Sequence, residues 1–186
     1  MKKIVLGLFI LLGFSTSIYS QYKEGSGSLL LGGSFSLFKA INYDVNLNGY
    51  GFGGGYESNF LGSDWTIGFG VSSITASDEL SDSAQISFSA LPVNIYGKYF
   101  FGNPNVRGYF SLGIGFQAST STLSGRGLYS ENYDNGYAFN FGVGMNYYIS
   151  SKAFVNLGYN FSYWDNNYLE DGLGHNFILG LGFQFN

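Results

Sequence analysis

The stretch Tyr137–Ile149 reads Tyr-Ala-Phe-Asn-Phe-Gly-Val-Gly-Met-Asn-Tyr-Tyr-Ile, with a large apolar side chain at every second position. Alternation of this kind predicts a β-strand, because successive side chains of a strand point to opposite faces. The run of 13 residues exceeds the usual strand length in globular proteins, about 5–6 residues. It is long enough to cross a bilayer obliquely, which takes about 9–11 residues.

The same alternation recurs along the chain and predicts eight strands in all. In the fourth strand the phase changes upstream of Leu91, because Ile86, Phe88 and Ala90 lie on the other parity. We expect a β-bulge between Ala90 and Pro92 to absorb this change. The predicted strands lie near residues 27–38, 49–57, 65–72, 91–99, 109–116, 137–149, 155–163 and 177–185.

The segments between these strands alternate in length. Short turns are predicted near 58–64, 101–106 and 150–153, and longer polar loops near 39–46, 74–85, 119–136 and 164–175. Short turns on one side and long loops on the other are typical of outer-membrane barrels. The pattern predicts an all-β fold, an eight-stranded antiparallel up-and-down transmembrane β-barrel. Its long loops are extracellular, and both termini are periplasmic.

Composition indicates which face of the barrel meets lipid. Aromatic residues make up 20% of the chain and charged residues 11%, whereas a soluble domain carries about 25% charge. A lipocalin-like barrel with its apolar face inward would have an almost uncharged exterior of Gly, Ser and Asn, which suits water poorly. Aromatic residues also gather near both ends of the strands, as interfacial girdles do. They are Tyr56, Trp65, Tyr99, Tyr147 and Phe185 at the turns, and Phe38, Tyr137, Tyr163 and Trp164 at the loops.

The N-terminus has the organisation of a secretory signal. Lys2 and Lys3 precede an apolar run over 4–14 and a small, polar segment over 15–20. We expect residues 1–20 to be the signal peptide and 21–186 to be the barrel domain. Removal of the two lysines leaves 6 basic against 12 acidic residues, a formal charge of −6. This charge argues against nucleic-acid binding, and the absence of cysteine excludes disulfides and thiol chemistry.

The segment 48–56 contains a literal G-x-G-x-x-G, formed by Gly49, Gly51 and Gly54. Such a motif binds phosphate only where it connects a strand to a helix, and no helix start follows it here. We instead assign Gly49, Gly51, Gly53 and Gly55 to the inward face of a strand. Glycine there leaves room for side chains that reach across a narrow lumen.

Four stretches together resemble the outer membrane protein beta-barrel domain family, the small porin-like barrels similar to OmpA and OmpX. They are GSLLLGGSFSL (27–37), LPVNIYGKYFF (91–101), FNFGVGMNYYIS (139–150) and HNFILGLGFQFN (175–186). The resemblance implies a monomer in the cell outer membrane that contacts its lipid and lipopolysaccharide, with no cofactor. It also implies folding by the barrel-assembly machinery, for which Phe183 and Phe185 would be the signal, although Asn186 and not an aromatic residue ends the chain.

His175 is the only histidine and has acidic neighbours at Asp165, Glu170 and Asp171. Lipid A deacylases and barrel proteases, which are outer-membrane enzymes, carry histidine at the outer rim. A triad would need a serine hydroxyl against the imidazole, but the H-x-S pattern of the deacylases is absent, because Asn176 and Phe177 follow. We expect no catalytic and no metal-binding residues. The acidic loops lack EF-hand spacing and are interpreted as a solvated rim rather than a calcium site.

Glu57, Lys98 and Arg107 share the inward phase near the short-turn end. We expect an interior ion-pair cluster there, beside Tyr96, Tyr109 and Tyr148, because buried charge is costly unless it is paired. The alternative is an ion-selective constriction. Eight strands leave an interior that side chains nearly fill, so the sequence favours a plug.

The predicted function is a structural or surface-interaction role without enzymatic activity, with the loops as the contact surface. The alternative is a small channel or a lipid- or glycan-binding barrel. The candidate adhesive aromatic residues are Tyr129, Tyr133, Tyr163, Trp164 and Tyr168.

Overall fold

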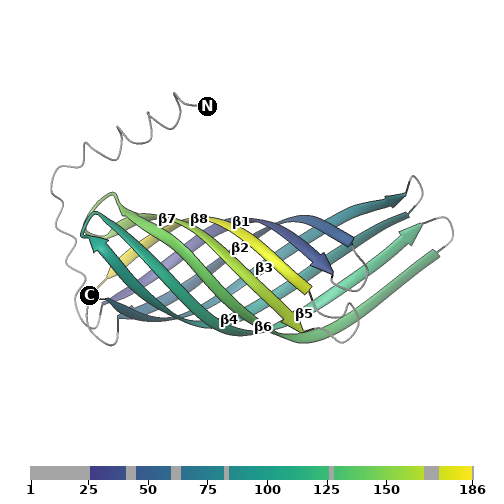
Figure 1. Ribbon diagram of the computed structural model, residues 1–186, viewed down its shortest axis with the longest axis horizontal. Coiled ribbons are helices and arrows are strands. Elements are labelled where there is room, and N and C mark those ends of the chain that lie inside the picture. Colours follow the sequence, from purple (N-terminus) through teal and green to yellow (C-terminus); the bar gives the residue numbers. More distant parts are fainter. Residues whose placement is uncertain are drawn as a thin grey trace, which may run out of the picture.

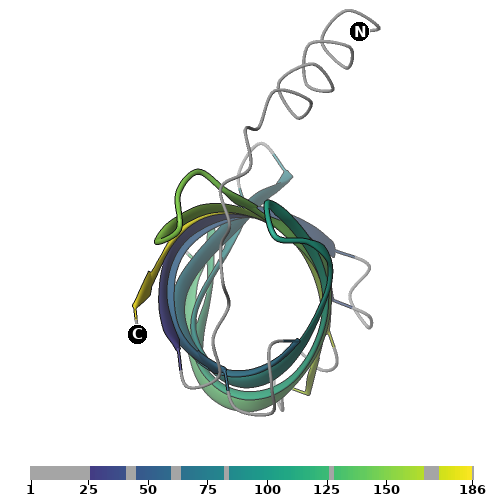
Figure 2. The same ribbon diagram turned by 90° about the vertical axis from the view of Figure 1, so that its left-hand side faces the viewer.

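The computed structural model describes residues 26–40, 45–59, 64–81, 84–125, 128–165 and 172–185. Eight antiparallel strands form a closed barrel in the order β1-β2-β3-β4-β5-β6-β7-β8, so that β1 also pairs with β8 (Figures 1 and 2). This confirms the predicted fold class. The strands are β1 Gly27–Ala40, β2 Val45–Asn59, β3 Trp65–Ser81, β4 Ala84–Asn103, β5 Val106–Gly125, β6 Leu128–Tyr148, β7 Ala153–Asp165 and β8 Gly172–Phe185.

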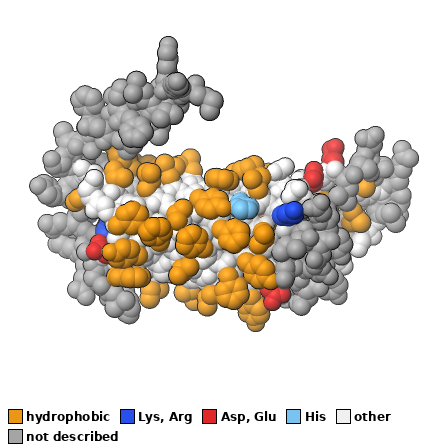
Figure 3. Space-filling view, viewed as in Figure 1, with side chains coloured by type: hydrophobic (Ala, Val, Ile, Leu, Met, Phe, Trp, Pro, Cys, Tyr) orange, Lys and Arg blue, Asp and Glu red, His pale blue; other side chains and the backbone are white. Residues whose placement is uncertain are grey.

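The alternation of apolar side chains sets the two faces of the barrel wall. Leu29, Leu31 and Phe35 of β1 are each about half exposed, whereas Ser28 and Ser36 are buried in the lumen. Exposed apolar side chains lie on all eight strands. On the face that Figure 3 shows, they form a broad band. Such a band is expected of a surface that meets acyl chains. No helix among the described residues is long and apolar enough to cross a membrane.

Two hairpins make the barrel taller on one side. The predicted loops over 74–85 and 119–136 are wrong, since β3 and β4 are separated by residues 82–83 alone, and β5 and β6 by 126–127. Continuous pairing joins β4 to β5 as far as Ala84↔Gly125 and β5 to β6 as far as Gly125↔Leu128. The ends of β3, β4, β5 and β6 therefore form a four-stranded sheet that protrudes past the other strands (Figure 1). We call this the protruding sheet.

The predicted bulge between Ala90 and Pro92 is also wrong. β4 keeps one register with β5 through Ala90↔Ser119, Leu91↔Ala118 and Pro92↔Gln117. The apolar side chains upstream of Leu91 belong to the inward face, because they fill the lumen at this level. The register irregularity between β3 and β4 lies at Glu79/Ser81, near the tip of their hairpin.

Aromatic side chains from widely separated strands meet across the lumen at the end where the sheet protrudes. The ring centroids of Phe38 (β1) and Trp164 (β7) are 4.6 Å apart, and those of Phe88 (β4) and Trp164 are 5.6 Å apart. The sequence placed Phe38 and Trp164 in the outer girdle, which is wrong, since they are only 5% and 7% exposed. They form an apolar plug with Leu47, Ile74, Ala76, Phe88, Ala90 and Ala138.

Glycine permits aromatic rings to lie flat against the inner wall. A Cβ at Gly68 would overlap the ring of Tyr96, and one at Gly182 would overlap the ring of Phe154. The glycines predicted to face inward on β2 do so, in a strand rather than in a phosphate-binding loop. Gly102 has a different role, because its φ of 110° at the β4–β5 turn lies in the left-handed region that side chains disfavour.

Candidate functional site

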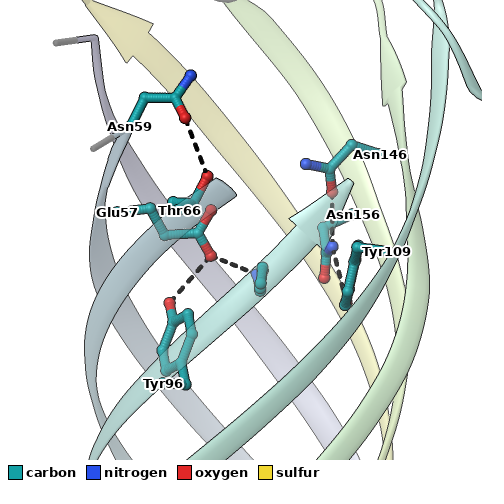
Figure 4. Close-up of polar contacts among 8 residues, drawn as sticks. Glu57, Asn59, Thr66, Tyr96, Tyr109, Asn146 and Asn156 are labelled. Carbon is teal, nitrogen blue, oxygen red and sulfur yellow. Dashed lines mark hydrogen bonds and ion pairs between the residues drawn. The ribbon is translucent and has the colours of Figure 1, made fainter. Parts of the chain in front are cut away.

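A polar cluster occupies the lumen toward the short turns. Glu57 (1% exposed) and Lys98 (7%) form a buried ion pair between β2 and β4. The same Glu57 oxygen, Oε1, accepts a hydrogen bond from the Tyr96 hydroxyl at 3.0 Å (Figure 4). The Lys98 ammonium lies 4.6 Å from the ring centroid of Tyr109 and 5.1 Å from that of Tyr96. Each charge thus has an opposite charge and polarisable neighbours, as burial requires.

Arg107 does not join Glu57. Its guanidinium bonds Asp64 at 2.6 Å and lies 5.1 Å from the ring centroid of Phe100. Asp64 precedes β3 at the short-turn end, and its side chain is half exposed. The three predicted residues are therefore split between two ion pairs, one inside the lumen and one at its mouth. Tyr148 packs on Phe154, with ring centroids 5.1 Å apart.

Neutral amides continue the network on the opposite wall. Asn156 (β7) donates to the Tyr109 hydroxyl at 3.1 Å and to Asn146 Oδ1 (β6) at 2.7 Å (Figure 4). Farther along the axis, a belt of amides and hydroxyls runs from β4 through β6, β7 and β8 to β1. Its members are Asn94, Asn140, Asn160, Ser162, Asn176 and Ser36.

A cavity of about 230 Å³ lies between the ion pair and the apolar plug. The amide belt except Ser36 lines one side of it, and Gly32, Gly53, Gly55 and Gly70 line the other. Tyr96 and Lys98 border it at one end and Trp164 at the other. The space is large enough for several water molecules. The cavity has both polar and apolar walls, and the Glu57–Lys98 pair and the apolar plug lie at its two ends.

His175 lies on the outward face of β8, apart from the polar cluster in the lumen. Its Nδ1 is 2.6 Å from the Tyr159 hydroxyl, and its ring packs edge-on against Phe161. Of the acidic residues predicted near it, Glu170 and Asp171 lie outside the described residues. Within the described part of the chain, no three His, Asp or Glu side chains come close enough to hold a metal ion.

The protruding sheet carries a second polar group that the sequence did not bring together. Three successive outward positions of β6 hold Tyr129, Glu131 and Tyr133. Both tyrosine hydroxyls donate to Glu131, Tyr129 to Oε2 and Tyr133 to Oε1, each at 2.9 Å. We call this group the Tyr-Glu-Tyr clamp. The hydrogen bond to Glu131 and the charge of that carboxylate raise the pKa of both phenols above the ordinary value.

The remaining predicted residues fall into three groups. Phe183 and Phe185 lie on the outward face of β8, 52% and 43% exposed. Trp164, a predicted adhesive residue, is inside the apolar plug, so that assignment is wrong. Tyr168 and the signal segment 1–20 lie outside the described residues.

Comparison with known proteins identifies the family. The profile of the outer membrane protein beta-barrel domain matches residues 6–185. No curated protein sequence matches the chain.

Solved structures with a similar fold include Ail, the attachment invasion locus protein of Yersinia pestis (21% identity, TM-score 0.59, 87% of this chain and 99% of that chain). Ail in complex with the heparin analogue sucrose octasulfate is also similar (22% identity, TM-score 0.56, 87% of this chain and 99% of that chain). Neisserial surface protein A is a third (14% identity, TM-score 0.63, 87% of this chain and 100% of that chain). At these identities the likeness shows the fold.

Proposed function

The chain belongs to the outer membrane protein beta-barrel domain family, and from this premise we propose that it is a non-enzymatic barrel whose protruding sheet contacts molecules outside the cell. Its place is the outer membrane, with the longer hairpins extracellular. The observation that carries the proposal is the protruding sheet itself. Among the described residues, the β6–β7 ladder begins at Tyr137↔Asp165, and β6 continues beyond it through nine further residues, 128–136. At about 3.3 Å per residue, this extension is about 30 Å long.

The barrel interior supports a surface role over transport. The apolar plug closes the lumen at the extracellular end, and the Glu57–Lys98 pair lies across it toward the periplasm. Opening a path for ions would require moving packed aromatic rings and separating a buried ion pair, both of which are costly. The cavity between them favours the alternative, a narrow channel or a binder of a small ligand.

The surroundings of His175 support a role without catalysis. A hydrolytic triad needs a nucleophile and a carboxylate on either side of the imidazole. The described contacts of His175 are instead the hydroxyl and ring of Tyr159 and the ring of Phe161. We propose that the histidine is an interface residue at the edge of the lipid-facing band.

The charge of the extracellular end limits the class of partner. The described charged side chains there are Lys39 and five carboxylates, those of Asp78, Glu79, Glu131, Asp134 and Asp165. Ail has been crystallised with a polysulfated heparin analogue. A polyanion of that kind is a poor electrostatic match for this acidic surface, so we propose a neutral or basic partner.

Assembly and oligomeric state complete the proposal. We propose that the barrel-assembly machinery reads Phe183 and Phe185 on the outward face of β8, and that the folded barrel is a monomer surrounded by lipid and lipopolysaccharide. Replacing both phenylalanines with serine should lower the amount of heat-modifiable barrel in the outer membrane. An unchanged amount of heat-modifiable barrel would contradict the assignment of Phe183 and Phe185 as the assembly signal.

A trimmed chain tests the surface role. Residues 77–87 and 120–133 are each replaced by an Asn-Gly turn, which retains the pairs Ala76↔Phe88 and Ser119↔Asp134 and the apolar plug. We expect the trimmed barrel to fold and insert, and cells that carry it to lose adherence to serum-protein-coated surfaces. Unchanged adherence would overturn the surface role. Steady conductance of the full chain in planar bilayers, or turnover of lipid A or peptide, would favour the alternatives.

A further inference from the structure

We propose that the outward face of the protruding sheet binds a neutral glycan of a partner outside the cell, with the Tyr-Glu-Tyr clamp as its anchor. The inference rests on the surface role proposed above and names the chemistry of the partner. Two sets of side chains carry it, the clamp on β6 and the rows of hydroxyl groups beside it on β3, β4 and β5.

Cross-strand register arranges the outward side chains of this face in three rows. Each row crosses β3, β4, β5 and β6, because directly paired residues point to the same face of a sheet. The rows are Thr75, Ser89, Thr120 and Tyr133; Ser77, Ser87, Thr122 and Glu131; and Glu79, Gln85, Ser124 and Tyr129. Serine and threonine therefore fill most of the face, and the clamp closes it along β6.

The composition of the three rows selects the class of ligand. They contain no aliphatic side chain and no basic one. Lipid has no apolar surface to contact here, and the apolar centre of a typical protein–protein interface is missing. The carboxylates of Glu79 and Glu131 repel a polyanion. A neutral molecule rich in hydroxyl groups, a glycan, matches a face made of hydroxyl donors and acceptors.

The clamp offers aromatic surface that is already held in place. Tyr129 is 71% exposed and Tyr133 is 72% exposed, and their hydroxyls bond the two oxygens of Glu131. Tyrosine has only two side-chain torsions, so it loses little conformational entropy on binding, and these bonds restrict it in advance. The negative face of its ring attracts the polarised C–H groups of a sugar ring.

Glu131 keeps acceptor capacity for sugar hydroxyls. An ionised carboxylate has about four lone-pair sites, and each of its oxygens accepts one described hydrogen bond from a tyrosine. Each oxygen can accept one more, so two neighbouring O–H groups of a sugar can bind the same carboxylate. Hydrogen bonds to a charged acceptor are the stronger ones. Thr122 and Thr120 lie directly opposite Glu131 and Tyr133 and place further hydroxyls beside the bound sugar.

The position of the clamp favours a partner outside the cell. Tyr137 packs edge-on against Phe116, with ring centroids 6.1 Å apart, at the extracellular end of the lipid-facing band. At about 3.3 Å per residue, Tyr133 lies about 13 Å and Tyr129 about 26 Å farther along β6. The clamp therefore lies beyond the lipid-facing band, where a glycan carried by another surface can reach it.

The test uses the full mature chain in phospholipid nanodiscs and three fluorescently labelled neutral glycans, maltohexaose, laminarihexaose and α-mannohexaose. Fluorescence anisotropy measures their binding. We expect the wild type to bind at least one of them and to bind a heparin hexasaccharide more weakly. Failure to bind any of the three, or tighter binding of heparin, would overturn the assignment of a neutral glycan.

Three variants locate the site on the glycan that binds. Replacing Tyr129 and Tyr133 together with serine should weaken binding about 10-fold through the loss of two ring contacts. Glu131→Gln should weaken it about 3–5-fold, because a neutral amide accepts weaker hydrogen bonds than a carboxylate. The pair Thr120→Val and Thr122→Val, which keeps the side-chain shape and removes two hydroxyls, should weaken it about 3-fold.

Matched controls remove the same groups elsewhere. Tyr50→Ser deletes a tyrosine that is 74% exposed but lies on β2, and Asp165→Asn deletes an exposed carboxylate at the end of β7. Both should leave the affinity unchanged, and every variant should keep heat-modifiable migration on gels. Equal losses from the controls and from the clamp variants would overturn the site.

The outcomes separate this inference from the surface role. If trimming abolishes adherence while the clamp and threonine variants bind the glycan as tightly as the wild type, the surface role stands and the glycan site is wrong. Loss of glycan binding when the nanodisc also contains lipopolysaccharide would show that the face binds sugars of its own membrane. That result would overturn the assignment to an outside partner.

Discussion

Removing the ammonium of Lys98 should destabilise the barrel more than any other single charge deletion within the described strands. The Lys98→Met variant leaves the Glu57 carboxylate in a site that is 1% exposed. Of the two described contacts to Glu57 Oε1, those from Lys98 and from the Tyr96 hydroxyl, only the second would remain. Breaking a buried pair by deleting one partner costs about 3–5 kcal/mol. We expect the lower end, about 3 kcal/mol, because the remaining phenol still solvates the carboxylate.

The assay is equilibrium urea unfolding in phospholipid vesicles, followed by tryptophan fluorescence and by heat-modifiable migration on gels. The double variant Glu57→Gln/Lys98→Met removes both charges but keeps an acceptor for Tyr96. It should recover about half or more of the free energy of unfolding that Lys98→Met loses. The control Lys152→Met removes an exposed charge in the β6–β7 turn and should change the free energy of unfolding by less than about 0.5 kcal/mol. Equal stability of Lys98→Met and the wild type would refute the buried-pair assignment.

Three further predictions follow from packing and from the clamp. Gly68→Ala should lower the free energy of unfolding by about 1–3 kcal/mol, because the new methyl group overlaps a tyrosine ring in the lumen. The control Gly97→Ala, whose new Cβ would have its nearest neighbour 3.9 Å away, should change it little. Equal unfolding midpoints for the two variants would contradict this prediction. Trp164→Ala should cost about 3–5 kcal/mol by emptying the apolar plug, and urea unfolding without a shift would show that the plug is not packed. Glu131→Gln should lower the pKa of Tyr133 toward 10.0 in a phenolate absorbance titration. Because the wild-type pKa is raised on folding, the clamp's contribution to stability is complete below the unfolded pKa and is lost as the pH rises through the folded pKa.

The period of two was sufficient to predict the barrel and the orientation of most side chains. Glu57 and Lys98 could be placed inside because their parity matched that of the small residues around them. They meet because β2 and β4 face the same narrow lumen. Arg107 had the same parity, but its partner Asp64 lies before β3 at the short-turn end. The alternation of side chains along a strand does not predict which residues outside the strands come close to it.

The ends of the strands could not be predicted, for a physical reason. Outside the lipid, a strand no longer needs an apolar face, so the protruding sheet is rich in Ser, Thr and Asn and resembles a loop. At this end of the barrel, apolar side chains that face the lumen were assigned to the outward face. Phe38, Phe88 and Trp164 are apolar because they fill the lumen at its extracellular end, whereas the sequence analysis assumed that apolar residues point toward lipid.

The most direct test of the account is the accessibility of single cysteines to a membrane-impermeant maleimide, which is straightforward because the native chain has none. The variants are Tyr133→Cys in the protruding sheet, Lys152→Cys in the β6–β7 turn and Leu181→Cys on the lipid-facing band. On intact cells we expect labelling of the first alone, with the second labelled only after the outer membrane is permeabilised and the third protected until detergent is added. Labelling of Lys152→Cys on intact cells, or of Leu181→Cys without detergent, would contradict the proposed orientation or the lipid-facing band.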